Sequence, residues 1–117
     1  LPGCPSKPPL VERPLLKIET AAELARVYET LANDTRIRLL HVLLKEGEIY
    51  PSGLAKKLGM KPQAVSNQLQ RLLDRGIVQT RRNGNNVLYR VVDSCVIELI
   101  DRGLCLLEDT RSSQVGR

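Results

Sequence analysis

Apolar residues recur every three or four positions in several separate stretches of the chain, a period typical of helices with one buried face. The clearest stretch is 61–75, which Pro62 opens and Gly76 closes. Proline suits the first position of a helix because its missing N–H would have no partner there, and glycine suits the C′ position after the last turn. The pattern predicts a helix whose apolar face is formed by Val65, Leu69, Leu72 and Leu73.

The same period predicts two helices earlier in the chain. A Thr-x-x-Glu capping box at Thr20 favours a first helix that ends near Ala32. Asp34 is placed to cap a second helix over about 35–45, which Gly47 ends. The inward faces are expected to be formed by Leu24, Tyr28 and Leu31 in the first helix and by Ile37, Leu39, Leu40, Leu43 and Leu44 in the second.

A third, shorter helix is predicted between a Ser52 cap and Gly59, with Leu54 and Leu58 facing inward. Only two residues then separate it from the 61–75 helix. Two helices joined by a tight turn, the second with an exposed polar face, are typical of a helix-turn-helix.

Residues 77–82 and 87–92 are rich in Val, Ile, Thr and Tyr and are predicted to form two short strands. The Asn-Gly-Asn-Asn sequence at 83–86 favours a tight hairpin because Asn and Gly tolerate positive φ. Ile49 and Tyr50 are expected to add a short strand beside the hairpin. A helix-turn-helix followed by a basic hairpin is the order of a winged helix-turn-helix.

A last helix is predicted over about 94–109, capped by Asp93 or Ser94. Nine of the thirteen residues from Cys95 to Leu107 are apolar or Cys, so most of its circumference is apolar. A surface helix of a small domain needs only one apolar stripe, and we therefore expect the second face to be buried in a homodimer. Two reading helices about one turn of DNA apart would match a palindromic site.

The predicted fold class is mainly α with a small β-hairpin: a homodimeric winged helix-turn-helix with the element order α-α-α-α-β-β-α. A length of 117 residues suits one domain. Five of the seven prolines fall in residues 1–14. We expect a flexible Pro-rich N-terminal arm at 1–17, a winged-helix DNA-binding and dimerisation domain at 18–109, and a flexible C-terminal tail at 110–117.

Positive charge is concentrated in the segment that holds the predicted reading helix and wing. Residues 56–90 contain eight basic residues and one acid, Asp74, so the segment carries +7 while the whole chain carries +5. This is the electrostatic footprint of a polyanion partner. The chain has no Trp or Phe and three Tyr, whereas single-strand binders rely on aromatic stacking. Double-stranded DNA is therefore the predicted partner.

Short neutral hydrogen-bonding side chains on the 61–75 helix suit base edges in a major groove, because Gln and Asn pair with adenine and Ser serves either role. A solvated helix face is the other interpretation of these residues. The predicted base readers are Gln63, Ser66, Asn67 and Gln70. The predicted phosphate and minor-groove contacts are Lys56, Lys57, Lys61, Arg71, Arg81 and Arg82, with Asn83 and Asn85 at the wing tip.

The chain has three cysteines, Cys4, Cys95 and Cys105. This number is odd and too small for a secreted disulfide scaffold, so we expect free thiols in a reducing cytoplasm. No run of about 18 apolar residues exists, and no membrane partner is expected. An enzyme is not expected either, because no cysteine lies near His41 in sequence and there is no Gly-rich phosphate loop or carboxylate constellation.

Three segments resemble the ArsR/SmtB family of bacterial metal-sensing repressors: LANDTR at 31–36, VSNQL at 65–69, and GIV at 76–78 with the Asn/Gly wing and Tyr89. The similarity covers about residues 20–109. It implies a winged-helix homodimer with the first and fifth helices at its interface. It also implies a bacterial, cytoplasmic repressor that binds operator DNA without ligand and releases it when an inducer binds.

The inducer site departs from the family's patterns. Members similar to this chain carry Cys-x-Cys near the third helix, where this sequence reads YPS at 50–52. Other members carry Asp-x-His and a distal His pair on the fifth helix, where this chain has DSC at 93–95 and then Leu106 and Asp109. Because His41 is the one histidine, an imidazole-rich site is not expected.

The cysteines are the remaining candidates for inducer ligands. Ten helical residues separate Cys95 from Cys105 by about 15 Å along the axis and about 80° around it, so they cannot share one ion within a protomer. Antiparallel fifth helices would place Cys95 beside Cys105 of the partner subunit, with Cys4 as a third thiolate. Thiolates select soft ions, so the predicted inducer is As(III), Sb(III), Cd(II), Pb(II) or Hg(II). Asp93 and Asp109 are predicted additional oxygen ligands for Cd(II).

Two other interpretations of the cysteines stay open. Both side chains can pack as small hydrophobes on an apolar helix. Alternatively, Cys95 and Cys105 sense thiol oxidation or persulfide without a metal, by crosslinking at the dimer seam and changing its geometry.

Overall fold

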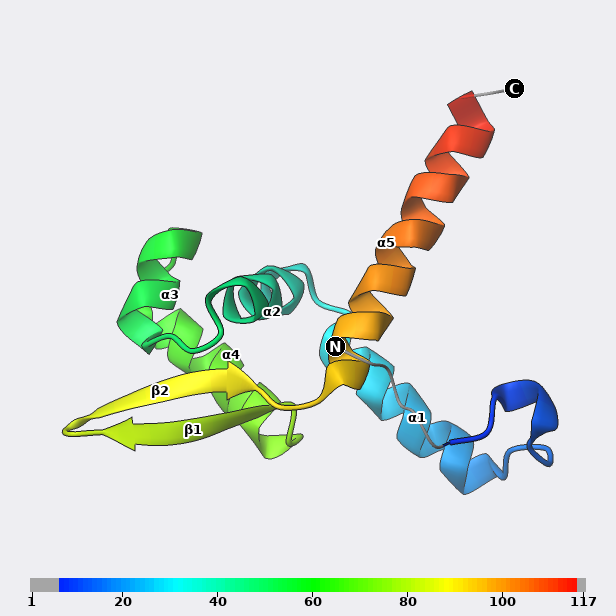
Figure 1. Ribbon diagram of the computed structural model, residues 1–117, viewed down its shortest axis with the longest axis horizontal. Helices are drawn as coiled ribbons and strands as arrows, with labels where there is room; N and C mark the ends of the chain where they lie inside the picture. The colour runs from blue at the N-terminus through cyan, green and yellow to red at the C-terminus, as the bar shows by residue number, and fades with distance from the viewer. Residues whose placement is uncertain (1–6, 116–117) are drawn as a thin grey trace.

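The computed structural model describes residues 7–115. Its elements, drawn in Figure 1, are a 3-10 turn η1 (Leu10–Glu12), the helices α1 (Ile18–Leu31), α2 (Asp34–Glu46), α3 (Pro51–Leu58) and α4 (Pro62–Asp74), the strands β1 (Val78–Asn83) and β2 (Asn86–Val91), and the helix α5 (Ser94–Val115). The helices and strands follow one another in the predicted order α-α-α-α-β-β-α, which confirms the winged helix-turn-helix fold class.

The hydrophobic core is built by α2, α3, α4 and the hairpin. Its fully buried side chains are aliphatic, as the composition requires: Leu39, Leu40, Leu43, Leu54, Val65, Leu69, Leu72 and Val78. They confirm most of the apolar stripes predicted for the second, third and fourth helices. Burial of one such leucine or valine contributes roughly 1.5–3 kcal/mol. This packing holds α4 against the rest of the winged-helix unit.

The helices α1 and α5 project from this core (Figure 1). Among the described buried hydrophobic residues, α1 contributes Leu31 and α5 contributes Val96. Leu24 and Tyr28, predicted to face inward with Leu31, are 44% and 50% exposed, and Ile37 at the start of α2 is 39% exposed. The prediction of an inner face for these three residues is wrong within one protomer, because most of α1 extends beyond the core and Ile37 lines an open groove between α1 and α5.

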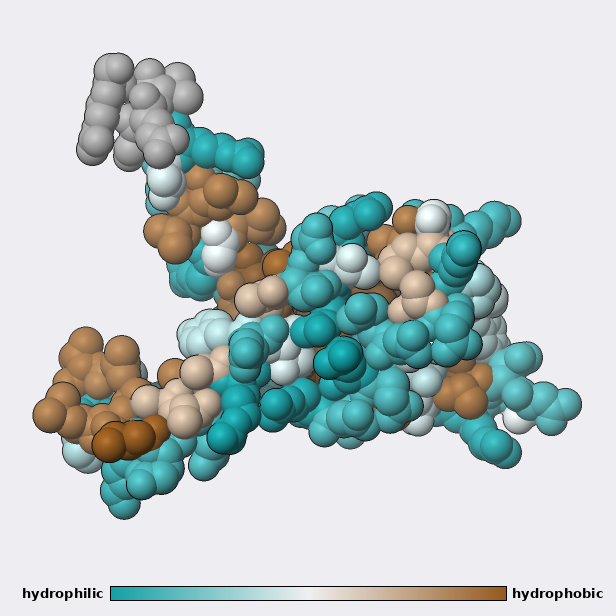
Figure 2. All heavy atoms as spheres, turned by 180° about the vertical axis from the view of Figure 1, so that it is seen from behind, coloured by the Kyte–Doolittle hydropathy of each residue, from teal (hydrophilic) through white to brown (hydrophobic). Residues whose placement is uncertain are grey.

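Apolar side chains gather on the two projecting parts of the molecule. Figure 2 shows them on the segment that precedes α1 and along α5, whereas the rest of this face is mainly hydrophilic. Leu15 in the first region is 99% exposed and Leu106 in the second is 69% exposed. None of the described helices, α5 included, combines the length and the hydropathy that a membrane span needs. The protomer therefore has two apolar surfaces that its own core does not cover.

Two helices begin at other residues than the sequence predicted. The N-cap of α1 is Lys17, which provides no side-chain cap, and Thr20 lies inside the first turn. The N-cap of α3 is Tyr50, and Ser52 lies inside that helix. Pro51 explains the second difference, because its fixed φ and missing N–H make it the natural first residue of a helix.

The second helix is capped by Asn33 instead of Asp34. Asn33 is extended, and its side-chain oxygen accepts a hydrogen bond of 3.0 Å from the backbone N–H of Arg36. Asp34 already belongs to the helix, so it cannot occupy the cap position. The last helix is longer than predicted, because α5 continues to Val115 instead of ending near 109. No proline or glycine interrupts that final stretch.

The wing is an antiparallel hairpin with one residue of offset from the predicted strands. Asn83 pairs with Asn86, so the turn contains only Gly84 and Asn85. Gly84 alone takes the positive φ, at +65°, as in hairpin turns with glycine at the first central position. A third strand was predicted at Ile49 and Tyr50, but the pairing beside the wing is limited to one isolated bridge between Ile49 and Tyr89 of β2.

Candidate nucleic-acid interface and effector helix

The exposed face of α4 carries the four predicted base readers. Its opposite face is fully buried, so the helix cannot turn these residues inward without opening the core. Gln63 donates a hydrogen bond of 3.1 Å to Asn67, and Gln70 donates one of 2.8 Å to Asp74. Both bonds are exposed, and both join residues one helical turn apart. They align the amide groups along the helix while leaving them open to exchange these bonds for base edges.

The predicted cations on α3, on α4 and in the turn between them are all exposed: Lys56, Lys57, Lys61 and Arg71. One of them is paired within the chain, since the ammonium of Lys57 lies 2.7 Å from a carboxylate oxygen of Glu46. An exposed pair of this kind is worth at most about 1 kcal/mol and exchanges readily with a phosphate. The structure therefore presents these cations on and beside α4, with Lys57 partly neutralised.

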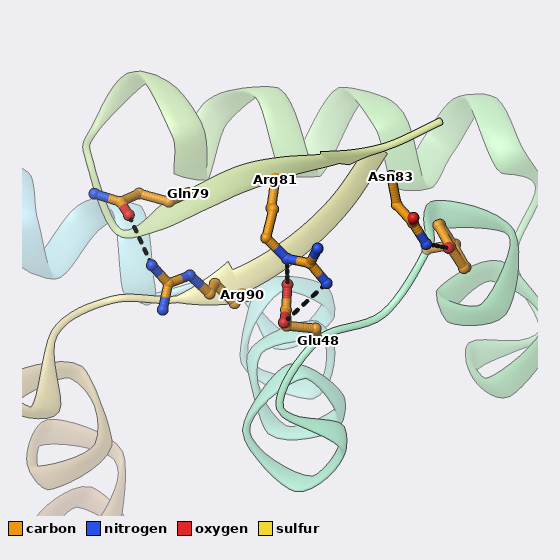
Figure 3. Close-up of polar contacts among 6 residues, drawn as sticks. Glu48, Gln79, Arg81, Asn83 and Arg90 are labelled. Atoms are coloured by element: carbon orange, nitrogen blue, oxygen red, sulfur yellow. Dashed lines mark hydrogen bonds and ion pairs between the residues drawn. The ribbon is translucent and has the colours of Figure 1, made fainter. Parts of the chain in front are cut away.

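The wing is held against the loop that leads into α3 by side-chain contacts shown in Figure 3. Arg81 donates to both carboxylate oxygens of Glu48, at 2.9 and 3.3 Å, and Asn83 donates to the hydroxyl of Tyr50 at 2.7 Å. The backbone of Ile49 pairs with Tyr89 in between. The Arg81 guanidinium hydrogen-bonds to Glu48, which lowers the pKa of that carboxyl below its ordinary value of 4.5.

This contact distinguishes Arg81 from Arg82, although both were predicted to contact DNA. The guanidinium of Arg81 is directed at Glu48 (Figure 3). Arg82 has no hydrogen bond or ion pair with any residue that the structure describes. Glu48 was not among the predicted site residues, because it lies outside the basic segment 56–90. Ile49 pairs with Tyr89 of β2, so the Glu48 carboxylate reaches Arg81 on the other strand of the hairpin, a contact that the local sequence does not indicate.

The predicted metal ligands on and beside α5 are spread over its length. The backbone N–H of Cys95 donates to a carboxylate oxygen of Asp93 at 2.8 Å, so Asp93 caps the helix, as one of the two predicted caps. Cys95 is disulfide-bonded, which contradicts the expectation of free thiols throughout. Cys105 is free and exposed, and Asp109 is exposed. Cys4 lies outside the described residues.

No group of three or more His, Cys, Asp or Glu side chains within the described part of the chain is arranged to hold a metal ion. The helical spacing keeps the two α5 cysteines apart within one protomer. Any ion held by both would need a second chain.

An apolar groove of about 480 Å³ lies between the end of α1, the start of α2 and the middle of α5. Its walls include Tyr28, Ile37 and Leu104, all of which are at least 39% exposed. Gly103 opens onto it, and a Cβ at that position would meet no atom within 4 Å. The groove and the apolar length of α5 form one continuous surface beside the winged-helix core.

Comparisons with known proteins agree with this arrangement. A family model described as the MarR family matches residues 33–86, from the start of α2 through the wing turn. The chain is 33% identical to the HTH-type transcriptional regulator NmtR of Mycobacterium tuberculosis over 89 residues, which are 76% of this chain and 73% of that protein.

Two solved structures extend the likeness to three dimensions. The AntR antimony-specific transcriptional repressor matches with a TM-score of 0.77 and 49% identity, over 94% of this chain and 99% of that one. The homodimeric winged helix-turn-helix DNA-binding domain of Mb0332 from Mycobacterium bovis, a possible ArsR-family regulator, matches with a TM-score of 0.71 and 30% identity. That match covers 84% of this chain and 93% of the other.

Proposed function

The chain belongs to the ArsR/SmtB family of winged-helix transcriptional repressors, and we propose that it is a homodimer released from double-stranded operator DNA when a thiophilic ion binds. The relatives are DNA-binding regulators, which confirms the prediction that the chain is not an enzyme. The observation that carries the proposal is the placement of α4. Its apolar face is locked in the core, and its neutral polar face stands exposed beside a basic wing.

In the proposed complex α4 enters the major groove. Gln63, Ser66, Asn67 and Gln70 read base edges there. The lysines of α3 and of the turn, together with Arg71 and the wing arginines, hold phosphates or the minor groove. Asn83 and Asn85 sit at the wing tip, which is where a wing meets the backbone of the duplex. These contacts supply the salt-dependent part of the affinity.

The partner protomer would cover the groove between α1 and α5. The apolar walls of this groove and the exposed leucines of α5 account for the second apolar face predicted from the sequence. The homodimeric state of the Mycobacterium bovis structure supports the same arrangement. Two copies of α4 would then reach successive turns of a palindromic operator.

Cysteine thiolates are the proposed ligands of the inducer: Cys95 of one protomer, Cys105 of the partner subunit, and Cys4. Cys105 is exposed on α5, where a second chain can approach it, and Cys95 must be reduced before it can bind an ion. Thiol donors favour As(III), Sb(III), Cd(II) or Pb(II), and the 49% identity to an antimony-specific repressor supports Sb(III) first. Asp93 and Asp109 are the proposed oxygen donors for Cd(II).

Binding of the ion lowers DNA affinity through thermodynamic coupling. If the ion binds best to a dimer whose reading helices are misaligned, DNA affinity must fall by the same factor by which DNA weakens ion binding. A coupling of 1–3 kcal/mol, or roughly 5- to 150-fold, is typical.

The test uses reduced protein under anaerobic conditions. It is titrated separately with Sb(III), As(III), Cd(II) and Pb(II) while thiolate charge-transfer absorption and the anisotropy of a labelled duplex are followed. The duplex is one that the wild-type protein has enriched from a random pool. We expect a saturating absorption band and release of DNA over the same concentration range.

Serine variants assign the ligands. Cys95→Ser and Cys105→Ser should each abolish the band and the release, whereas Cys4→Ser should weaken ion binding if it supplies a third thiolate. Glu98→Gln, on an exposed position of the same helix, is the matched control and should behave as wild type. Ion binding that survives loss of both α5 cysteines would contradict the ligand assignment and leave the DNA-binding assignment intact.

A second candidate is the same repressor acting as a thiol-redox or persulfide sensor without metal. The disulfide at Cys95 supports oxidation of this side chain, but Cys105 is a free thiol, so that disulfide is not the predicted crosslink between Cys95 and Cys105. This candidate predicts that a disulfide oxidant or a persulfide donor releases the duplex in the presence of a chelator, and that dithiothreitol restores binding. Release by ions alone, from fully reduced protein, would exclude it.

A further inference from the structure

We propose that Arg36 is a positioning residue that ties the orientation of the reading helix α4 to that of the projecting helix α1, through a hydrogen bond to Gln68. The inference rests on the proposed function and deepens it. It states how the arrangement of α1, on the dimer side of the protomer, reaches the residues that read DNA.

One guanidinium bridges two helices that are not consecutive in the chain. The Nε of Arg36 donates to the side-chain oxygen of Gln68 on α4 at 2.8 Å. Its Nη1 donates to the backbone carbonyl of Thr30 in the last turn of α1 at 2.7 Å, with the Glu29 carbonyl farther away at 3.5 Å. The planar fork of Arg presents several donors at fixed angles, and a lysine ammonium cannot reproduce this geometry.

The end of α1 needs this contact. The last four carbonyls of a helix have no partner within the helix, and a cation near them is favourable. The backbone N–H groups of Ala32 and Asn33 take the carbonyls of Tyr28 and Leu31. The Glu29 and Thr30 carbonyls remain, and Arg36 takes both. The side-chain oxygen of Asn33 accepts a hydrogen bond from the backbone N–H of Arg36, which fixes the backbone from which the Arg36 side chain extends.

Few other contacts join α1 to the winged-helix unit. Leu31 is the α1 residue that enters the hydrophobic core of the described chain, so α1 is attached at its C-terminal end. The apolar contacts of α4 with the core are non-directional, whereas a charge-assisted hydrogen bond is directional. The bond at Gln68 therefore adds one directional contact to the apolar packing that holds α4 in the core. Asn67, a predicted base reader, is the adjacent residue, so a shift at Gln68 reaches it through the helix backbone.

The bond also has room to rearrange. A polar cleft of about 540 Å³ opens beside it, and its walls include Arg36 with the carboxylate residues Glu29 and Asp74. Both carboxylates are alternative acceptors for the guanidinium within this cleft. A shift of α1 that carries the Thr30 carbonyl away would leave Arg36 free to change partner. Such a two-position contact is the kind of element that couples distant sites.

The test is made without an inducer. Affinities are measured for the enriched duplex and for a scrambled duplex of the same composition, and their ratio gives the specificity. Gln68→Met keeps the side-chain length and removes the acceptor. We expect it to lower affinity for the enriched duplex about tenfold, the cost of a lost bond to a charged group, while affinity for the scrambled duplex stays unchanged. Gln68→Glu keeps an acceptor and should retain the wild-type ratio.

Arg36→Lys should reproduce the loss, and adding it to Gln68→Met should cost little more, because both substitutions remove the same contact. Gln79→Met is the matched control, since it removes an exposed amide from β1 and lies outside the proposed contact. Melting curves and far-ultraviolet circular dichroism confirm that each variant is folded.

The outcomes separate this inference from the proposed function. An unchanged specificity ratio in Gln68→Met, with wild-type protein that prefers the enriched duplex, overturns the role of Arg36 alone. Equal losses on both duplexes also overturn it, because they show a general loss of phosphate contacts. A wild-type protein that binds no duplex overturns the proposed function and this inference together.

Discussion

The winged-helix core and the two projecting helices differ in how completely a single chain buries their apolar side chains. The core of α2, α3, α4 and the wing buries its aliphatic side chains completely and leaves polar residues outside. The helices α1 and α5 have comparable apolar content, yet Tyr28, Leu104 and Leu106 are 50%, 50% and 69% exposed. The difference teaches that one chain is sufficient to bury the core, whereas in the proposed homodimer the apolar faces of α1 and α5 need a second chain.

The largest expected effect is on the core. Leu40→Ala removes a side chain that is 0% exposed and should lower the free energy of unfolding by about 2–5 kcal/mol. The loss should appear at every protein concentration, because no partner is involved. Chemical denaturation at two concentrations 100-fold apart measures it. A loss below about 1 kcal/mol would show that this part of the core is loosely packed.

The second largest effect is expected on the dimer dissociation constant, which depends on the projecting helices and not on the core. Leu104→Asp places a charge in the apolar groove and should raise the dimer dissociation constant at least about 100-fold, since an unpaired buried charge costs several kcal/mol. The protomer itself should keep its helical spectrum, because Leu104 is half-exposed there. Sedimentation equilibrium gives the constant.

Asp101→Ala, on an exposed position of the same helix, is the control and should leave the dimer unchanged. A tight Leu104→Asp dimer would contradict the assignment of the groove to the partner protomer. The melting temperature should also depend on protein concentration for the wild type.

A smaller effect is expected at the wing. Arg82→Ala should weaken binding to any duplex several-fold and reduce the salt slope by about 0.9, the value for one phosphate contact. Arg81→Ala should cost less, because its guanidinium is already paired with Glu48. Glu48→Gln should strengthen binding by releasing Arg81. Titrations across a range of salt concentrations test all three, and equal losses for the two arginines would show that the Glu48 contact does not persist on DNA.

The smallest effect is the pH dependence of that contact. The pKa of Glu48 is lower in the folded chain than its ordinary 4.5, so the contact contributes stability above the unfolded pKa and loses it as pH falls through the folded one. The difference in melting temperature between wild type and Glu48→Gln should be constant from about pH 6 to pH 8. It should vanish well below pH 4.5. A difference that changes near neutral pH would point to another group.

The elements of the fold could be read from the sequence because their signals are local. The period of Val65, Leu69 and Leu72, with the Pro62 and Gly76 boundaries, describes α4 almost to the residue. The wing followed from the Asn-Gly-Asn-Asn sequence at 83–86, which contains its turn. Cap residues were less predictable, because several Ser, Thr, Asp and Asn residues compete near each helix start and only the backbone conformation decides among them.

Contacts between distant residues could not be read in this way. Arg36 belongs to a segment that carried the family resemblance, but its bond to Gln68 spans 32 positions and depends on how α1, α2 and α4 pack. The pairing of Arg81 with Glu48 spans 33 positions and needs the register of the wing against the preceding loop. The oxidised state of Cys95 likewise has no signature in its local sequence. Which side chains face solvent on α4 followed directly from its apolar stripe.

The exposed apolar surface of α5 has a consequence for the lifetime of the protein in a cell. A newly made chain that has not yet dimerised exposes apolar leucine side chains, which chaperones and proteases recognise in incompletely assembled proteins. Single chains should therefore be degraded faster than assembled ones. The abundance of the regulator would then rise more steeply than in proportion to its rate of synthesis.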